Sequence, residues 1–133
     1  MDSLTQEVSD METYIALRGA TTVEGDYPLK MDTAVSELMK ELYSKNGIEE
    51  EDIAYVLFSQ THDLRMRNAA TSCRIGGFTE NVPIFCVQEA DVAGGLRHAV
   101  RVLIVLKRER EGRPHMVYLH EAAKLRPDYK EKV

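Results

Sequence analysis

One arginine and one glutamate lie in or beside apolar stretches, where a charged side chain must be compensated by a partner. Arg101 lies between Val100 and Val102 in an apolar, β-branched stretch, and Glu89 follows another such stretch. Moving a charged group out of water costs several kcal/mol unless a partner compensates it. Arg101 therefore needs an anion, which is either a structural ion-pair partner such as Glu89 or Asp91, or an oxygen of a bound ligand.

A second arginine, Arg18, ends an apolar run just before Gly19, and the same two interpretations apply to it. If residues 97–106 alternate as a strand, Arg97 and Arg101 share one face of that strand. Two guanidinium groups would then point the same way. An anion-binding site and a set of structural ion pairs both remain open on these residues alone.

Other familiar active-site patterns are missing from the sequence. The Gly94-Gly95 pair lacks the spacing of a phosphate-binding loop, and the four histidines form no metal-binding motif. No serine or cysteine lies in a nucleophile motif. We therefore expect no metal site and no ordinary nucleophilic catalysis.

The composition is that of one small domain. The chain has 133 residues, 44% of them hydrophobic, and a formal net charge of -5, which argues against a nucleic-acid or anionic-membrane surface. Its two cysteines are too few for a disulfide framework and fit reduced thiols. The first residues do not resemble a secretory signal and no apolar run is long enough to span a membrane, so we expect a cytoplasmic protein.

Hydrophobic periodicity predicts the elements that must position the charged residues. An amphipathic helix is expected from Asp26 as its N-cap, through Pro28 in the first turn, to a stop at Asn46-Gly47. A shorter helix is expected between Asn68 as its cap and Gly76-Gly77. Strands are expected at residues 14–18, with an exit at Gly19, and at residues 53–59, 82–88, 97–106 and 115–119. The remaining segments are expected to be a solvated acidic connector at 49–52, a charged turn at 107–114 and a short apolar piece at 122–125.

Five strands with one long and one short helix predict an α+β (mixed α/β) protein with a five-stranded mixed sheet. One long helix covers only one side of such a sheet. Apolar surface on the strands at 53–59 and 100–106 is therefore expected to contact another copy of the chain. Residues 1–13 are interpreted as an N-terminal extension, and residues 14–133 as a single domain.

Four motifs occur in the order of one known family. They are LRGATTVEGD (17–26), CVQEADVAGGL (86–96) with RVLIVL following, HMVYL (115–119) and LRPD (125–128). Together they resemble the AroH-type monofunctional chorismate mutases, over nearly everything from residue 14 to 129. The resemblance implies an isomerase of the shikimate pathway that converts chorismate to prephenate, toward phenylalanine and tyrosine, without a cofactor. It also implies a pseudo-barrel homotrimer with active sites in the clefts between subunits.

The resemblance further implies roles for individual residues. Arg101 matches the arginine that faces the breaking ether oxygen, and Arg18 matches the one that holds a substrate carboxylate. Glu89 matches the carboxylate that accepts a hydrogen bond from the substrate hydroxyl. The other substrate-binding positions are the pocket thiol Cys86, the phenol Tyr118, the further cation Arg74, the helix residue Ala70, and Leu125 and Arg126 in a C-terminal segment that folds over the mouth of the site.

The sequence departs from the family pattern at the short helix. Asn68-Ala69-Ala70 stands where Phe-Pro-Ala is common, and Thr71 stands where a lysine is frequent. One apolar lid contact and one auxiliary cation therefore lack a direct counterpart. Arg65 or Arg67 is a candidate replacement for that lysine, and the alternative is that both are solvated loop arginines.

Two other function classes compete with this one. A chorismate-mutase-like protein without turnover would be a non-catalytic trimeric binding protein for an aromatic metabolite, and a trimeric enamine or imine deaminase would have a similar overall shape. The retained charged residues around Arg101 and Glu89, and their order along the chain, favour the mutase over both. An assay that follows loss of chorismate separates a mutase from a binding protein.

Overall fold

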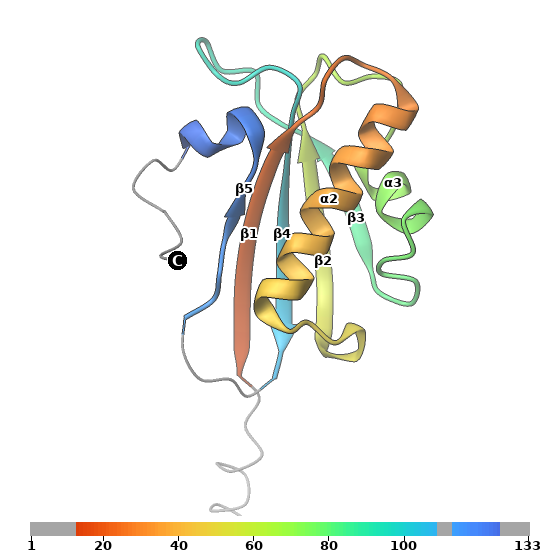
Figure 1. Cartoon of the computed structure of the whole chain (residues 1–133), viewed down its shortest axis with the longest axis vertical. Coiled ribbons are helices and arrows are strands. Elements are labelled where there is room, and N and C mark those ends of the chain that lie inside the picture. The colour runs from red at the N-terminus through yellow and green to blue at the C-terminus, as the bar shows by residue number, and fades with distance from the viewer. Residues whose placement is uncertain (1–12, 109–112, 126–133) are drawn as a thin grey trace, which may run out of the picture.

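A computed structural model describes residues 13–108 and 113–125 and contains one five-stranded mixed sheet (Figure 1). The strand order is β3-β2-β4-β1-β5, with β4 antiparallel to β1 and β2, and with β2–β3 and β1–β5 parallel. The strands are β1 (Tyr14–Thr22), β2 (Ile53–Gln60), β3 (Ile84–Gln88), β4 (Ala99–Lys107) and β5 (Val117–Tyr118); the helices are α2 (Pro28–Asn46), α3 (Ala69–Ile75) and the 3-10 turns η1 (Glu50–Asp52) and η2 (His120–Leu125). The predicted α+β class with a five-stranded mixed sheet is confirmed.

Some of the sequence predictions concern residues outside these ranges, and others concern the chain as a whole. Most of the N-terminal extension, part of the charged turn and Arg126 lie outside the described residues. The division into an extension at 1–13 and one domain at 14–133 stays a prediction. Within the described residues no helix is long and apolar enough to cross a membrane, and the cytoplasmic location also stays a prediction.

Helix α2 covers the centre of the sheet with the predicted apolar stripe. Its buried apolar side chains recur at one-, three- and four-residue steps and are Met31, Ala34, Val35, Leu38, Met39 and Leu42. Pro28 begins the helix, and Gly47 ends it in the left-handed conformation (φ 55°) with its N–H donating to the Tyr43 carbonyl. Both of these predicted end signals are confirmed.

The predicted N-cap of α2 is wrong. The cap residue is Tyr27, which makes no side-chain cap hydrogen bond. Asp26 instead accepts hydrogen bonds at Oδ1 from the backbone N–H groups of Arg65 (2.9 Å) and Met66 (3.0 Å). The aspartate therefore anchors the loop after β2 rather than the start of the helix.

The expected strand exit at Gly19 is also wrong. Strand β1 continues to Thr22, and Gly19 pairs with Val102 on one side and with Val117 on the other. A Cβ atom at this position would lie 2.8 Å from Leu42 Cδ1 and 3.1 Å from the Val117 carbonyl oxygen. The glycine is needed because α2 lies so close to the sheet here, and not because the strand ends.

The acidic connector is not simply solvated. It contains the turn η1, and the carboxylate of Glu50 accepts hydrogen bonds from the Tyr43 hydroxyl and from the backbone N–H of Thr79 (3.2 Å). Burial, followed by the contact with Glu50, raises the pKa of Tyr43. Glu50 therefore joins α2 to the turn after α3.

Both helices lie on the same face of the sheet (Figure 1). We call the opposite side the uncovered face; the strand register places on it alternate residues of each long strand, including Tyr14, Tyr55, Leu57, Phe85, Val87, Leu103 and Val105. Phe85 is 68% exposed and Tyr14 is 60% exposed. Apolar groups of this size rarely stay in contact with water across a whole sheet face.

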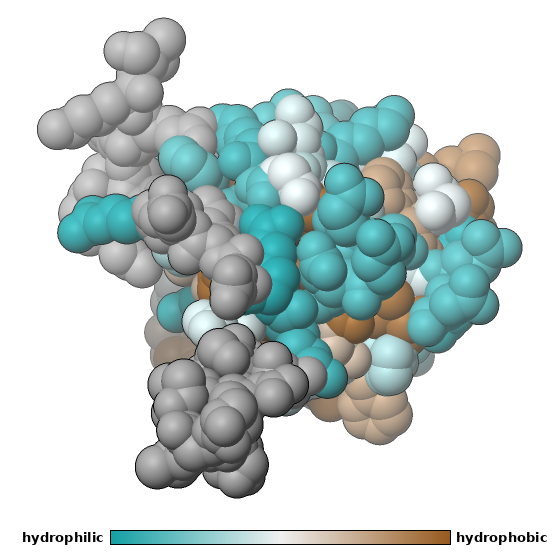
Figure 2. All heavy atoms as spheres, turned by 90° about the horizontal axis from the view of Figure 1, so that it is seen from below, coloured by the Kyte–Doolittle hydropathy of each residue, from teal (hydrophilic) through white to brown (hydrophobic). Residues whose placement is uncertain are grey.

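The two ends of the sheet differ in character. Figure 2 looks from below at the end where β1 and β2 begin, and the described side chains there are mainly hydrophilic, with hydrophobic ones between them. At the opposite end β2 and β3 finish and β4 begins. That end carries Glu89, Arg97 and Arg101, three of the charged residues singled out in the sequence.

Candidate active site

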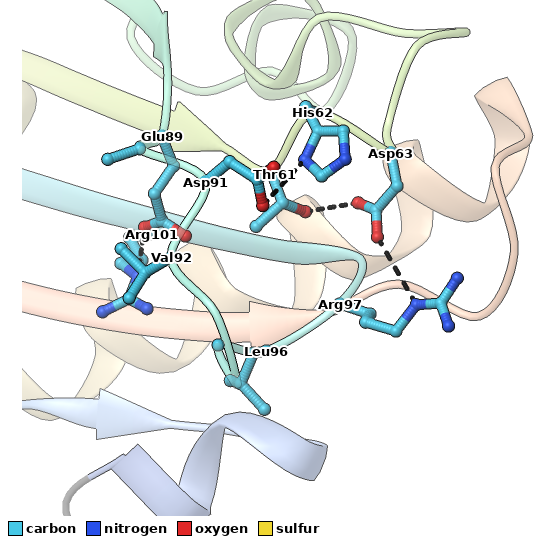
Figure 3. A pocket seen from close by; sticks show the side chains of 11 residues that line it. Thr61, His62, Asp63, Glu89, Asp91, Val92, Leu96, Arg97 and Arg101 are labelled. Carbon is cyan, nitrogen blue, oxygen red and sulfur yellow. Dashed lines mark hydrogen bonds and ion pairs between the residues drawn. The ribbon is translucent and has the colours of Figure 1, made fainter.

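A cavity of about 420 Å³ lies at this end of the sheet (Figure 3). Its walls are the segment after β2, the segment between β3 and β4, and the first residues of β4. The lining residues are Thr61, His62, Asp63, Glu89, Ala90, Asp91, Val92, Gly95, Leu96, Arg97 and Arg101. Two of the three residues expected to be catalytic, Glu89 and Arg101, are among them.

Glu89 and Arg101 contact each other directly. Arg101 Nε lies against Glu89 Oε1, with the two side chains only 35% and 19% exposed for the arginine and the glutamate. Water screens such a pair less than it screens a fully exposed one.

Strand β2 holds the glutamate in place. The backbone N–H of Glu89 donates to the Gln60 carbonyl (2.9 Å), and the Ser59 hydroxyl donates to Glu89 Oε1 (3.4 Å). Ser59 is also the register partner of Arg101 across β2 and β4. Serine, glutamate and arginine therefore form one fixed group at the strand ends.

Arg18 and Tyr118 lie on the same face of the sheet as Arg101. Ala20 of β1 is the register partner of both Arg101 and Tyr118, and Arg18 is two residues before Ala20. Residues paired in a sheet, and residues two apart along one strand, share a face. We call Arg18, Glu89, Arg101 and Tyr118 the sheet-face group.

The expectation that Arg97 and Arg101 share a strand face is wrong. Strand β4 begins at Ala99, and His98 just before it has a positive φ of 51°. Arg97 therefore precedes the strand, and its side chain is 88% exposed. Figure 3 shows it at the far end of the cavity from Arg101, directed toward Asp63, whose carboxylate is 4.0 Å from Arg97 Nε.

Cys86 and Ala70 lie on the other side of the sheet. Cys86 is the register partner of the buried Phe58 and packs with Ala70 against the core beneath α3. Burial raises the pKa of the Cys86 thiol, and the backbone N–H groups of Ala69 and Ala70 offset part of this effect. We call Cys86, Ala70 and Arg74 the helix-side group.

Arg74 and Leu125 are not brought to the cavity within one chain. The Arg74 guanidinium, near the end of α3, donates to carbonyl oxygens of Thr79, Glu80 and Val82 at 3.4–3.5 Å. Leu125 ends η2 and is half-buried. The predicted site residues therefore fall into two groups on opposite sides of the sheet. Leu125, at the end of η2, belongs to neither group.

Comparison with known proteins decides the family. Residues 14–129 match the family described as chorismate mutase type I. The chain belongs to this family. Two relatives named chorismate mutase AroH are similar to this chain. The protein of Bacillus subtilis (strain 168) is 34% identical over 113 residues, which are 84% of this chain and 89% of the relative. The protein of Thermus thermophilus is 38% identical over 114 residues, 84% of this chain and 93% of the relative.

A solved structure agrees with the sequence comparison. The chorismate mutase from Clostridium thermocellum superposes with a TM-score of 0.78 at 32% identity, covering 83% of this chain and 98% of that one. The resemblance drawn from the four motifs is confirmed. This chorismate mutase is accordingly an enzyme of the isomerase class, as the sequence predicted.

The loop arginines of this chorismate mutase are not equivalent. Arg67 forms a two-point contact with Asp32, at 3.1 Å through Nε and 3.2 Å through a terminal nitrogen, and Ser72 donates to the same carboxylate (2.6 Å). Arg67 is therefore neither a solvated arginine nor a free replacement for the missing lysine. Arg65 is exposed, and its role as a replacement for that lysine stays a prediction.

Sequence reasoning missed two residues next to the site, Ser59 and Gln60. Both end β2, and their side chains contact Glu89 and Cys86 respectively. Two polar residues closing an otherwise apolar strand were the available signal. Predicting their contacts also required the register of β2 with β3 and β4.

Proposed function

We propose that this chorismate mutase rearranges chorismate to prephenate beside the Arg101–Glu89 contact, by means of fixed charges. The observation that carries the proposal is that an arginine and a glutamate, both largely shielded from water, are held together at the wall of a cavity. Glu89 follows β3 and Arg101 lies in β4, and β2, which lies between these two strands, is hydrogen-bonded to Glu89 and paired with Arg101. The two opposite charges therefore keep a constant separation while substrate binds and leaves.

The reaction needs such an arrangement because its transition state is polarised. The ether carbon–oxygen bond of chorismate breaks ahead of formation of the new carbon–carbon bond, so negative charge grows on the oxygen and positive charge grows on the ring. The electrons move in one cycle, and no proton is transferred. Rate acceleration then comes from holding the compact conformer and from charges placed where charge develops.

Each member of the sheet-face group has a role in this proposal. Arg101 stabilises the ether oxygen with a planar, permanently charged group that needs little reorganisation. Glu89 accepts a hydrogen bond from the substrate hydroxyl and lies near the ring. Arg18 and Tyr118, on the same face, bind a substrate carboxylate.

The helix-side group is proposed to complete the site from a second copy of the chain. Cys86, Ala70 and Arg74 lie beyond the sheet from Arg101 in the same chain, whereas the uncovered face is apolar and large. Packing another copy on that face would bury it and would supply the remaining walls. We propose a homotrimer with three such shared sites, in which Leu125 and Arg126 fold over the mouth.

The test is a kinetic comparison of two arginine variants of the full chain. Arg101→Lys should fold, but its kcat/KM for chorismate should fall about 10²–10³-fold, because lysine cannot reproduce the fixed direction of the guanidinium. Arg97→Lys is the matched control, since Arg97 lines the same cavity but is 88% exposed, and it should behave as wild type. Near-normal turnover by Arg101→Lys would sink the role given to Arg101.

A further inference from the structure

The side chain of Gln60, the last residue of β2, makes four hydrogen bonds. Its Oε1 accepts from the backbone N–H of Ala69 (2.8 Å) and from the thiol of Cys86 (3.2 Å). Its Nε2 donates to the carbonyl oxygens of Leu64 (2.9 Å) and Arg67 (3.0 Å). The orientation of the amide is determined, because a flipped amide would set oxygen against two carbonyls and NH₂ against an N–H.

These four partners belong to three different segments on the helix side of the sheet, which we call the helix-side wall of the site. Leu64 and Arg67 lie in the loop 61–68, Ala69 is the first residue of α3, and Cys86 lies in β3. Helix α3 has only seven residues and therefore few internal hydrogen bonds. Acceptors outside the helix that bind its first backbone N–H groups help to fix where it begins. Asn68 Oδ1 accepts from Ala70, and Gln60 accepts from Ala69.

The main chain of the same residue reaches the sheet-face group. The Gln60 carbonyl oxygen accepts the backbone N–H of Glu89 at 2.9 Å. One residue therefore bonds to Glu89 through its backbone and to the helix-side group through its side chain. Within one chain, the start of α3 is thus held to the same strand end that bonds Glu89.

We propose that Gln60 is a positioning residue of this enzyme, whose amide holds Cys86 and the start of α3 in the arrangement that substrate binding requires. The proposal rests on the proposed function, because it takes Cys86 and Ala70 as walls of the site. Gln60 itself touches no reacting atom. Its effect should therefore appear in substrate binding more than in the rearrangement step.

The first test is the variant Gln60→Met, which has a similar length and can form none of the four hydrogen bonds. A small displacement of the wall should lower kcat/KM about tenfold, mainly through a higher KM. The matched control is Asn81→Leu, which also replaces an amide by an apolar group of similar size, but at an exposed position in the turn before β3. The control should keep the wild-type kinetic constants.

A second readout does not depend on activity. The rate at which Cys86 reacts with a neutral aromatic disulfide is measured by mass spectrometry of the individual cysteine peptides. Loss of the acceptor at Gln60 should raise this rate about threefold to tenfold, because the thiol is no longer held in a hydrogen bond. Cys73 is the internal reference: it is fully buried, burial raises its pKa to about 11, and its rate should not change.

A third variant covers the case in which Gln60→Met fails to fold, which faster labelling of both cysteines would reveal. Gln60→Glu keeps the two acceptor contacts but has no donor for the carbonyls of Leu64 and Arg67, so KM should still rise. Its negative charge beside the Cys86 thiol should slow the labelling of that thiol. The two changes distinguish a displaced wall from general unfolding.

The outcomes separate this proposal from the proposed function. A raised KM together with faster Cys86 labelling, at an unchanged Cys73 rate, supports the positioning role. An unchanged KM in folded Gln60→Met overturns it, whatever the thiol does. If the wild-type protein does not consume chorismate, the proposed function fails, and the Cys86 rate still reports whether Gln60 holds the wall.

Discussion

Glu89 shows how one carboxylate serves both folding and chemistry. It lies against Arg101 and accepts a hydrogen bond from Ser59. The charge of Arg101, which required an anion on sequence grounds, therefore has a partner within the chain. In the proposed reaction substrate oxygen becomes its second partner, so the two interpretations of Arg101 are compatible.

Substitutions of Glu89 should distinguish hydrogen bonding from charge. Glu89→Gln keeps an oxygen acceptor for the substrate hydroxyl, whereas Glu89→Ala keeps none. We expect the alanine variant to lose about 10²–10³-fold in kcat/KM and the glutamine variant to stay at least tenfold more active than alanine. Equal losses in both variants would assign the role to the negative charge instead.

At the scale of elements, the sequence predicted what depends on near neighbours. The apolar stripe of α2, its Pro28 start, its Gly47 stop and the Asn68 cap of α3 are all local patterns, and the structure has each of them. The predicted strands exist, with bounds that differ by a few residues. Local periodicity was sufficient because each of these features involves residues only a few positions apart.

Three of the errors involve partners that lie far apart in the sequence. Asp26 bonds to Arg65 and Met66, Gly19 meets Leu42, and Glu50 meets Thr79. No local pattern contains those contacts. The same holds for the site: the family motifs predicted which residues belong to it, but the division into sheet-face and helix-side groups depends on strand register.

The close approach of α2 to β1 gives a prediction at this scale. In Gly19→Ala the new methyl group would meet Leu42 Cδ1 at 2.8 Å and the Val117 carbonyl at 3.1 Å. Relieving these contacts should lower the free energy of unfolding by about 1–3 kcal/mol, measured by urea denaturation. Ser44→Ala, at an exposed position on α2, is the control. A wild-type midpoint for Gly19→Ala would contradict the packing argument.

The connection between β2 and β4 depends on Asp63. Its carboxylate accepts hydrogen bonds from Thr61 Oγ1 (2.5 Å) and from the His98 N–H (3.1 Å). Burial acts to raise the pKa of Asp63, but the hydrogen bonds from Thr61 and His98 hold it below its usual value. The stabilisation is therefore present above the unfolded-state pKa and is lost as the pH falls through the lower folded-state pKa.

Asp63→Asn should accordingly have a pH-dependent effect. At pH 7 the variant should lose about 1–3 kcal/mol of unfolding free energy, because hydrogen bonds to a charged acceptor are replaced by weaker ones. The difference from wild type should begin to shrink near about pH 4, the usual pKa of an aspartate, and should disappear once the pH is below the lower folded-state pKa. Urea unfolding at several pH values measures the difference in unfolding free energy. The control is Asp91→Asn, because the Asp91 side chain is 74% exposed. A difference that does not vary with pH would contradict the assignment.

At the scale of the whole molecule, the uncovered face determines the proposed assembly. Phe85 and Tyr55, 68% and 45% exposed, lie on it, whereas Leu29, 76% exposed, lies on α2 on the other side of the sheet. Phe85→Glu should reduce the assembly to single chains and remove activity, since each site would lose its second half. Leu29→Glu should change neither. Sedimentation velocity together with the chorismate assay tests both variants, and active monomers would refute the shared site.

The central position of β4 also governs how the chain can fold as it is synthesised. Strands β1 and β2 do not pair with each other, and each pairs with β4, which ends at Lys107. Before the ribosome has released that residue, only β2 and β3 can pair, and β1 has no antiparallel partner. The enzyme therefore combines a small size with contacts between residues far apart in sequence, which favours slow, late closure of the sheet over stepwise folding from the N-terminus.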